Sequence, residues 1–338
     1  MLKMRLKKRL KGVLAGAMLL MTAAAGAQDI GFSQFYANPL YLNPGLAGSA
    51  VAPRIAVVYR GQWPGLVSAF TTVSASYDQY VNDLHGGIGA IVMTDRQGDH
   101  GALTTSMVGL MYAFRFQVSS KINISAGLQA SLVNNALNWD DNLRFPSQIH
   151  EELGFTYSNQ GVSQPGKLSV WNADFNAGVV VSGQQWYAGL AASHLTQPNQ
   201  AFYAEDRVPM KITVHGGGFI NVAEERRRQS SFALGTPIIS PNLVYQYQGG
   251  FHYFNYGLYL DWMPFLVGVW FRNGLQNADA FIFQVGVQQD YFKVGYSYDV
   301  TVSKLANSTA GAHEVTLGVM LPVPEQKKKV KAIRCPSF

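Results

Sequence analysis

The side chains that could do covalent or metal chemistry are spread along this chain of 338 residues without a catalytic pattern. The seven histidines show no metal-ligand spacing, and the motifs HExxH and GxSxG are absent. They are His85, His100, His150, His194, His215, His252 and His313. The pair Asp140-Asp141 is only a weak calcium candidate. We therefore expect no catalytic residue, no metal and no cofactor, and we rank an outer-membrane enzyme as the least favoured hypothesis.

Ionic chemistry has a clearer pattern, because ten charged residues share one face of strand-like stretches. The cations are Arg60, Arg115, Lys211, Arg272 and Lys293, and the anions are Asp78, Asp174, Asp261, Asp299 and Glu314. An ionised group facing lipid costs about 2–4 kcal/mol at the membrane midplane, so these side chains must face a lumen. Their balance favours ion pairs in a filled interior, since an unpaired buried charge is costly. A selectivity ring lining an open pore is the alternative.

The elements that must position these charges are β-strands. In "YFKVGYSYDVT" (residues 291–301) and "VWNADFNAGVVVS" (residues 170–182), apolar and polar residues alternate with a period of two. Such runs are longer than the strands of most soluble sandwiches. They place aromatic residues near their ends, which is typical of outer-membrane barrels. We predict an all-β transmembrane barrel in the bacterial outer membrane, with about 14 antiparallel strands and a range of about 12 to 16.

The connections between the predicted strands give an independent test of this fold. The strands are expected to begin near Arg54, Ser68, Gly86, Ala102, Lys121, Ser169, Gln185, Lys211, Ser230, Tyr253, Phe265, Ala280, Phe292 and His313. Connections after even-numbered strands are short, whereas residues 136–167, 196–209 and 304–312 form longer ones. Outer-membrane barrels have short periplasmic turns and long external loops. This pattern predicts that both termini are periplasmic.

The two ends of the chain account for its net positive charge. Six basic residues between Lys3 and Lys11, an apolar run and Ala25-Gly26-Ala27 predict a signal peptide over residues 1–27. The part from Gln28 to Pro324 holds 15 basic and 19 acidic residues, so no nucleic-acid partner is expected. Cys335 is the only cysteine, which excludes an intramolecular disulfide. The predicted organisation is a signal peptide, a non-sheet segment (residues 28–52), the barrel (residues 53–322) and a basic tail (residues 323–338).

The non-sheet segment contains "FSQFYANPLYLNPGLAG" (residues 32–48), with two Asn-Pro steps. Proline disfavours helix at the preceding asparagine and removes a backbone donor, so the segment should be compact but not part of the sheet. Either it plugs the barrel or it docks a periplasmic partner. The residues assigned to this role are Phe32, Ser33, Gln34, Asn38, Pro39, Asn43, Pro44 and Gly48.

The tail "PVPEQKKKVKAIRCPSF" (residues 322–338) becomes basic and then ends in an apolar stretch. Either it is a solvated periplasmic extension or it docks on a partner or on anionic envelope material. The residues assigned to a contact are Lys327, Lys328, Lys329, Cys335, Pro336 and Phe338. Cys335 is either a reactive thiol or buried against the base of the barrel.

Several motifs along the chain resemble one family. They are the Asn-Pro segment, "YRGQW" (residues 59–63), "SYD" (residues 76–78), "YSYD" (residues 296–299), "HEVTLG" (residues 313–318) and the terminal "CPSF". Together they resemble the PorP/SprF proteins of the type IX secretion system of Bacteroidota. The resemblance implies a non-enzymatic outer-membrane barrel that serves protein export and is linked to gliding motility or to surface attachment of adhesins.

The resemblance also implies partners: outer-membrane lipid, a large secreted surface protein or adhesin, and a periplasmic peptidoglycan-binding lipoprotein or another secretion-system component. A scaffold or anchor for export is therefore our functional hypothesis. A passive porin or a transporter of hydrophobic substrates is the alternative. An open pore would conduct ions, and a plugged scaffold would not.

Overall fold

A computed structural model of the protein describes residues 29–66, 70–98, 101–139, 149–150, 154–155, 165–203, 205–222, 237–275, 277–289, 291–302, 309–322 and 333. No helix within these ranges is long and apolar enough to cross a membrane. The predicted signal peptide lies outside the described residues, as does the predicted tail apart from Ile333.

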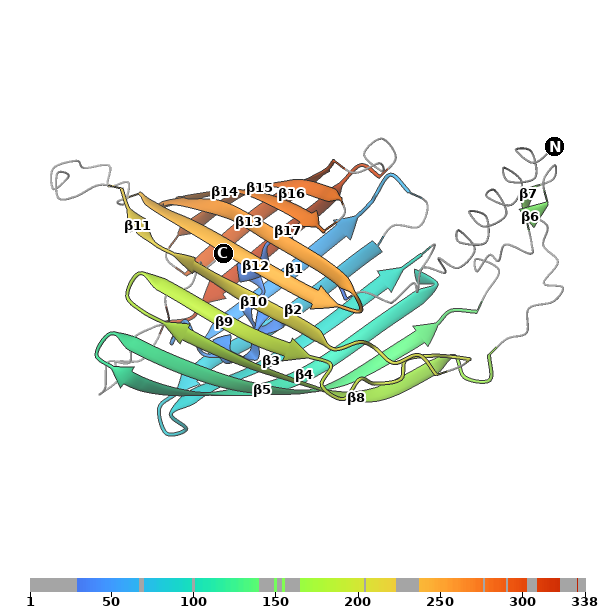
Figure 1. Ribbon diagram of the computed structural model, residues 1–338, viewed down its shortest axis with the longest axis horizontal. Helices are drawn as coiled ribbons and strands as arrows, with labels where there is room; N and C mark the ends of the chain where they lie inside the picture. The colour runs from blue at the N-terminus through green and yellow to red at the C-terminus, as the bar shows by residue number, and fades with distance from the viewer. Residues whose placement is uncertain are drawn as a thin grey trace, which may run out of the picture.

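Fourteen antiparallel strands of the described chain form a closed β-barrel, as predicted (Figure 1). Each strand pairs with the next along the chain, β1 pairs with β17, and β10 pairs with β12. The barrel strands are β1 (Arg54–Gln62), β2 (Phe70–Val81), β3 (Gly86–Gln97), β4 (Leu103–Ser119), β5 (Ile122–Leu137), β8 (Ser169–Ser182), β9 (Trp186–Ser193), β10 (Lys211–Gly218), β12 (Ile238–Gln248), β13 (Phe251–Trp262), β14 (Phe265–Gly274), β15 (Ala278–Gln289), β16 (Phe292–Thr301) and β17 (Ala312–Met320). Short strands β6 (Ile149–His150), β7 (Gly154–Phe155) and β11 (Ile220–Asn221) lie in the connections.

The period of two in the sequence becomes a two-faced wall. On β16 the side chains of Val294 and Tyr296 are exposed on the outside, while Ser297 and Asp299 on the same strand are buried inside. Exposed positions of the other barrel strands likewise carry aliphatic and aromatic side chains, such as Leu110 on β4 and Phe283 on β15. The outer surface is therefore suited to lipid, and the polar groups are directed into the lumen.

The two ends of the barrel differ in their connections. At the short-turn end, where β4 meets β5 and β13 meets β14, most links are tight turns. At the long-loop end, many more residues separate β5 from β8 and β9 from β10. Arg54 and Met320 are paired at the short-turn end, where the barrel sheet starts and finishes.

Two connections depart from this pattern. At the short-turn end β10 stops at Gly218 and β12 begins only at Ile238, whereas Gly249-Gly250 makes a tight turn at the long-loop end. The strand expected near Ser230 is also displaced, because that position lies outside the described residues and β12 begins at Ile238. These departures all concern β12 and its hairpin with β13, and the number of barrel strands is still the predicted 14.

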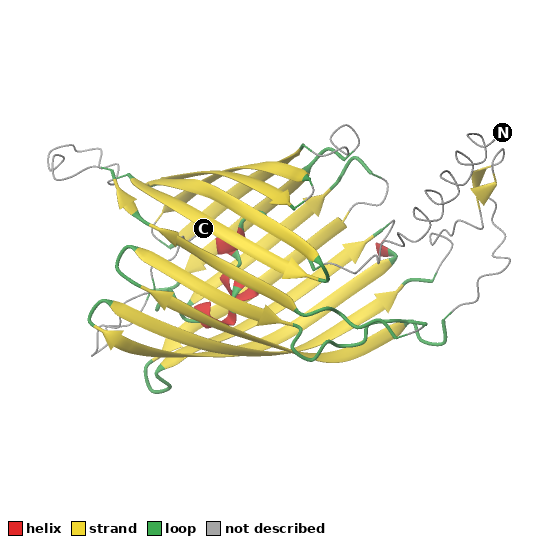
Figure 2. Ribbon diagram, viewed as in Figure 1, coloured by secondary structure: helices red, strands yellow, loops and turns green. Residues whose placement is uncertain are grey.

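Residues 29–53, called the lumenal segment from here on, lie inside the ring of strands. They form η1 (Phe35–Ala37), α2 (Pro39–Leu42) and η2 (Pro44–Leu46), which Figure 2 shows as short helices within the barrel. Proline opens α2 and η2, where a missing backbone donor costs little. The side chain of Asn43 caps η2 by accepting a hydrogen bond from the Gly45 amide at 2.8 Å. The Asn-Pro steps thus fold the segment into a compact unit.

Two apolar clusters pack the lumenal segment against opposite walls. Phe35, Tyr36 and Leu46 pack with residues of β8, β9 and β12–β15, including Tyr187 and Trp270. Phe32, Leu40 and Ala47 form the second cluster, with residues of β1 and β3–β5. The barrel therefore has a hydrophobic core, and much of it is supplied by this non-sheet segment.

Candidate functional site

The first cluster of polar contacts joins the lumenal segment to the seam between the first and last barrel strands. The carboxylate of Glu314 accepts hydrogen bonds from the backbone amides of Ser33 and Gln34, at 2.8 and 2.9 Å. The guanidinium of Arg60 lies 3.2 Å from Glu314 and 3.2 Å from Asp299. The hydroxyl of Ser33 donates to Asp299 at 2.6 Å. These buried groups form one ionic network, called the seam cluster below.

The side chain of Gln34 extends this network along the wall. Its oxygen accepts a hydrogen bond from the hydroxyl of Thr316 at 2.7 Å, and its amide donates to the Glu314 backbone carbonyl at 3.0 Å. Gln284 donates to the Ser33 carbonyl at 2.7 Å. All of these groups are buried, so each hydrogen bond replaces one to water that burial removed. The two motif residues Ser33 and Gln34 are therefore held at a defined place on the wall.

A second cluster holds Asn43 against β8, β9 and β10. Its side-chain amide donates to the carbonyls of Val179 and Leu190, both at 3.3 Å, and lies 3.0 Å from Nε2 of His215. Inward-facing glycines make room for this approach: a Cβ at Gly178 would collide with Asn43, and one at Gly127 with Pro44. Asn38 donates to the hydroxyl of Ser74 at 3.1 Å on the opposite side.

A third cluster lies toward the short-turn end. Arg54 makes a bidentate ion pair with Asp78 through bonds of 2.8 and 2.9 Å, and Asp78 also accepts the amide of Gly48 at 2.8 Å. Gly48 has φ of 65°, a conformation that favours glycine. Arg115 donates to the carbonyl of Gly48 at 2.8 Å. Two strands and the end of the lumenal segment are joined at this glycine.

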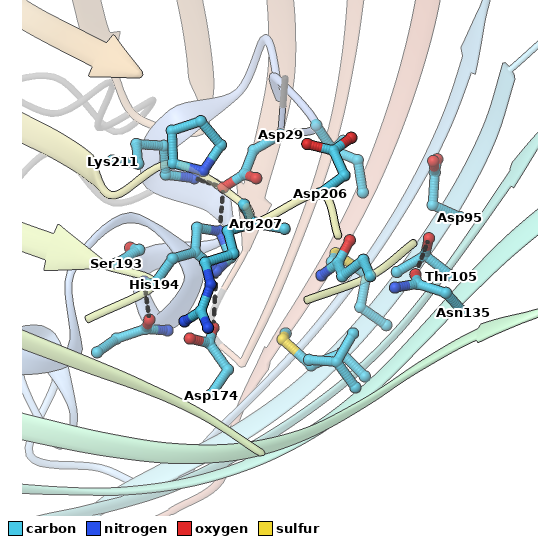
Figure 3. A pocket seen from close by; sticks show the side chains of 18 of the residues that line it. Asp29, Asp95, Thr105, Asn135, Asp174, Ser193, His194, Asp206, Arg207 and Lys211 are labelled. Atoms are coloured by element: carbon cyan, nitrogen blue, oxygen red, sulfur yellow. Dashed lines mark hydrogen bonds and ion pairs between the residues drawn. The ribbon is translucent and has the colours of Figure 1, made fainter. Parts of the chain in front are cut away.

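The fourth cluster, at the long-loop end, holds Asp29 (Figure 3). His194 bridges two acids, with 2.9 Å from Nε2 to Asp29 and 2.9 Å from Nδ1 to Asp174. The ammonium of Lys211 lies 2.5 Å from Asp29. Burial alone would lower the pKa of His194, but Asp29 and Asp174 raise it to about 9. Burial opposes ionisation of Asp29, yet Lys211 and His194 hold the pKa of that carboxyl well below its usual range. Both groups are therefore charged at neutral pH.

The structure places the predicted lumenal charges in several separate groups. Arg60, Asp299 and Glu314 belong to the seam cluster, and Arg272 joins it at 3.2 Å from Asp299. Asp78 and Arg115 meet at Gly48, whereas Asp174 and Lys211 lie at the long-loop end. Lys293 is buried and interacts electrostatically with half-buried Asp261 at the short-turn end.

Every predicted residue of the Asn-Pro motif is buried in the lumen. Of the tail only Ile333 is described: its side chain is buried with Leu46, and its amide donates to the carbonyl of Ser49 at 3.0 Å. The tail residues assigned to a contact, Lys327, Lys328, Lys329, Cys335, Pro336 and Phe338, lie outside the described residues.

The sequence pattern did not single out several ionic residues of the lumen, among them Asp29, Arg54, Asp95, His194 and Asp279. Arg54 carried a usable signal, because it shares the strand parity of Arg60. Asp95 likewise stands at an inward position of β3. Asp29 and His194 lie outside the strands, where alternation says nothing.

The long-loop side of the lumenal segment is hollowed by two cavities. One has a volume of about 400 Å³ and is lined by β3–β5, Asp29, Lys211 and the link between β9 and β10. The other, of about 370 Å³, lies beside Arg60 and Arg272. Within the described ranges, no group of three histidine, cysteine or acidic residues is placed to hold a metal ion.

Comparisons with known proteins identify the sequence family. The model described as "Type IX secretion system membrane protein PorP/SprF" matches residues 24–319. No curated protein matches the chain. Similar solved structures include BamA from Haemophilus ducreyi, with 10% identity over 80% of this chain and 70% of that chain and a TM-score of 0.41. Omp33 of Acinetobacter baumannii shows 6% identity over 80% and 100% of the chains, with a TM-score of 0.42. The hydrocarbon channel TodX, as a deletion mutant, shows 10% identity over 82% and 92%, with a TM-score of 0.43.

Proposed function

The chain belongs to the PorP/SprF family of type IX secretion system membrane proteins, and from this premise we propose that it is a plugged, non-enzymatic scaffold for protein export. It is an outer-membrane barrel associated with that secretion system. The finer role proposed here is anchorage: the barrel holds a large secreted surface protein, such as an adhesin of gliding motility, at the cell surface. A periplasmic peptidoglycan-binding lipoprotein or another secretion component is its proposed inner partner.

The filled lumen is the observation that carries this proposal. The lumenal segment contacts both walls through two apolar clusters and four polar ones, and residues 32–40 are all buried. A passive pore needs a continuous aqueous path, whereas an anchor needs a rigid body in the membrane. A packed segment fixed by buried ionic hydrogen bonds supplies rigidity.

The lumenal segment is proposed to act as a plug, and the lumenal charges as the ion pairs that hold it. The Asn-Pro motif then contributes to partner binding only through the barrel shape that it maintains. In this arrangement the partner surfaces are the connections at the long-loop end and the short-turn end. In the proposed orientation the short-turn end faces the periplasm and the long loops face the cell exterior.

The test is affinity purification of the tagged protein from detergent-solubilised outer membranes, with mass spectrometry of the co-purified proteins. We expect a large secreted surface protein or a peptidoglycan-binding lipoprotein to be recovered. Reconstitution of the same preparation in planar bilayers should give little ion conductance. A barrel that purifies alone and conducts ions would overturn the proposal and favour a porin or a transporter of hydrophobic substrates.

A further inference from the structure

The larger cavity at the long-loop end has a wall built of two parallel rows of side chains. Strand register places Asp95 beside Thr105 and Thr105 beside Asn135, across β3, β4 and β5. The same register places Met93 beside Met107 and Met107 beside Val133 in the next inward row. A polar row thus lies directly beside an apolar one, and both line the cavity (Figure 3 labels the polar row).

Asp95 is an unusual charge for this lumen. Only 2% of the residue is exposed, and its carboxylate accepts hydrogen bonds from Thr72 at 2.6 Å and Gln97 at 2.8 Å. Both donors are neutral, and no cation of the described chain lies within ion-pair distance of Asp95. The other buried carboxylates, such as Asp78 and Asp299, have arginine partners. A buried carboxylate without a cation is unfavourable unless a ligand supplies one.

Asn135 offers a second unsatisfied group on the same row. Its side-chain oxygen accepts a hydrogen bond from Thr105 at 2.8 Å, but its Nδ2 group has no acceptor among the described residues, although only 3% of Asn135 is exposed. Asp95 and Asn135 are separated by two strand spacings, about 10 Å. The wall therefore presents an acceptor for a cation and a donor for a carbonyl, with Thr105 between them and the thioether and aliphatic surface of the neighbouring row beside them.

The other charged residues that line the cavity among the described residues do not pair with Asp95. Asp29, His194, Lys211 and Asp174 satisfy one another in the cluster on the facing side. Asp206 and Arg207 are exposed to solvent. Asp95 is thus the buried lining charge that lacks an opposite charge among the described residues.

We propose that this cavity binds a cationic group carried on an aliphatic stem, as in a lysine or arginine side chain. The ammonium or guanidinium lies at Asp95, the stem lies on Met93, Met107 and Val133, and a carbonyl oxygen accepts from Asn135. The stem length of a basic side chain suits the separation between the two polar ends. The inference deepens the proposed function and rests on it only for taking a polypeptide as the source of the cation.

The test uses full-length barrel in detergent and two C-terminally amidated peptides that carry fluorescein in amide linkage on the N-terminus, Ala-Leu-Lys-Leu-Ala and the same peptide with norleucine in place of lysine. Fluorescence anisotropy should give about tenfold tighter binding of the lysine peptide, because only it offers a charge-assisted hydrogen bond. Asp95→Asn should reduce the affinity for the lysine peptide to that of the norleucine peptide. Asp261→Asn, which changes a carboxylate at the short-turn end, is the matched control and should change neither affinity.

A second variant guards against a folding defect in Asp95→Asn. Thr105→Lys places a tethered ammonium beside Asp95 and should block binding of the lysine peptide, while the barrel keeps its heat-modifiable migration on gels.

Unlabelled hexylammonium, added as a competitor, identifies the source of the cation: full displacement of the peptide favours a free amine, and weak displacement favours a polypeptide. Equal binding of the two peptides, or undiminished lysine-peptide binding by folded Asp95→Asn, would overturn the site. Either result leaves the export proposal to its own purification test.

Discussion

Arg60 on the first barrel strand lies directly opposite Glu314 on the last, with 3.2 Å between Nη1 and Oε2. The pair spans the seam that closes the barrel. Glu314 also accepts the amides of Ser33 and Gln34, so one carboxylate serves both the seam and the lumenal segment. Barrel closure and seating of the segment are therefore coupled through a single buried acid.

Glu314→Gln should destabilise the barrel strongly. The substitution keeps the shape but leaves the Arg60 guanidinium buried with Asp299 as its remaining carboxylate, and an amide nitrogen replaces one of the two acceptors for the segment. Removing one partner of a buried ion pair lowers the free energy of unfolding by about 3–5 kcal/mol. We expect a lower urea midpoint in gel-shift unfolding assays. Glu205→Gln, at an exposed position, should leave the midpoint unchanged, and an equal midpoint for both variants would refute the coupling.

The barrel itself was predictable because alternation is a local property of the sequence. In a stretch such as residues 291–301, the alternation of apolar and polar residues shows which side chains share a face. The apolar face must point outward, because charged side chains facing lipid are costly. The hairpin of β12 and β13 was harder, since Pro241 and the polar residues around it weaken the strand pattern. Its tight Gly249-Gly250 turn also lies at the end where long loops were expected.

The pairing inside the lumen could be predicted only in part. Parity indicates that Arg60 and Asp299 face inward, but their contact depends on strand register between segments far apart in the sequence. The contacts of Ser33 and Asn43 depend on how a non-sheet segment fits a closed ring, which no local pattern describes. The two Asn-Pro steps indicated a compact fold for this segment. The sequence showed a high glycine content, but not which inward-facing glycines make room for the segment.

Gly127→Val should dislodge the lumenal segment from the wall of β5. A side chain there would collide with the backbone of Pro44 and Gly45, which cannot rotate away. Overpacking of this kind costs about 1–3 kcal/mol. We expect single-channel recordings in planar bilayers to show conductance events that are rare in the native protein. Gly61→Val is the matched control, because Gly61 has only the Tyr59 side chain nearby, at 3.7 Å. Silent recordings from folded Gly127→Val would show that the segment is not what closes the lumen.

Ile333→Ala should loosen the base of the lumenal segment. The side chain of Ile333 is buried in the cluster with Leu46, although the residue lies far from the segment in sequence. Truncating a buried isoleucine costs about 2–5 kcal/mol, and a site near the barrel end should fall at the low end of this range. Differential scanning calorimetry should show a lower unfolding temperature. Ile220→Ala, at an exposed position of β11, should have no measurable effect, and equal shifts for both would exclude a docked tail.

His194 should make barrel stability depend on pH in the alkaline range. Its pKa is raised from 6.5 to about 9 by Asp29 and Asp174, which outweigh the opposing effect of burial. The charged form is thus favoured by folding, so its contribution is complete below about pH 6.5 and is lost as pH rises through about 9. A shift of this size corresponds to about 3 kcal/mol at its maximum.

The measurement is the urea midpoint of the native barrel and of His194→Gln between pH 6 and pH 10. Glutamine keeps a polar group at the turn but carries no charge to attract the two acids. The native protein should be the more stable at pH 6, and the difference should shrink as pH approaches 10, where His194 is neutral in both states. Gln200→Ala, in the same connection, controls for local disturbance and should preserve the native pH profile. A stability difference that stays constant across this range would show that His194 acts through packing and not through its charge.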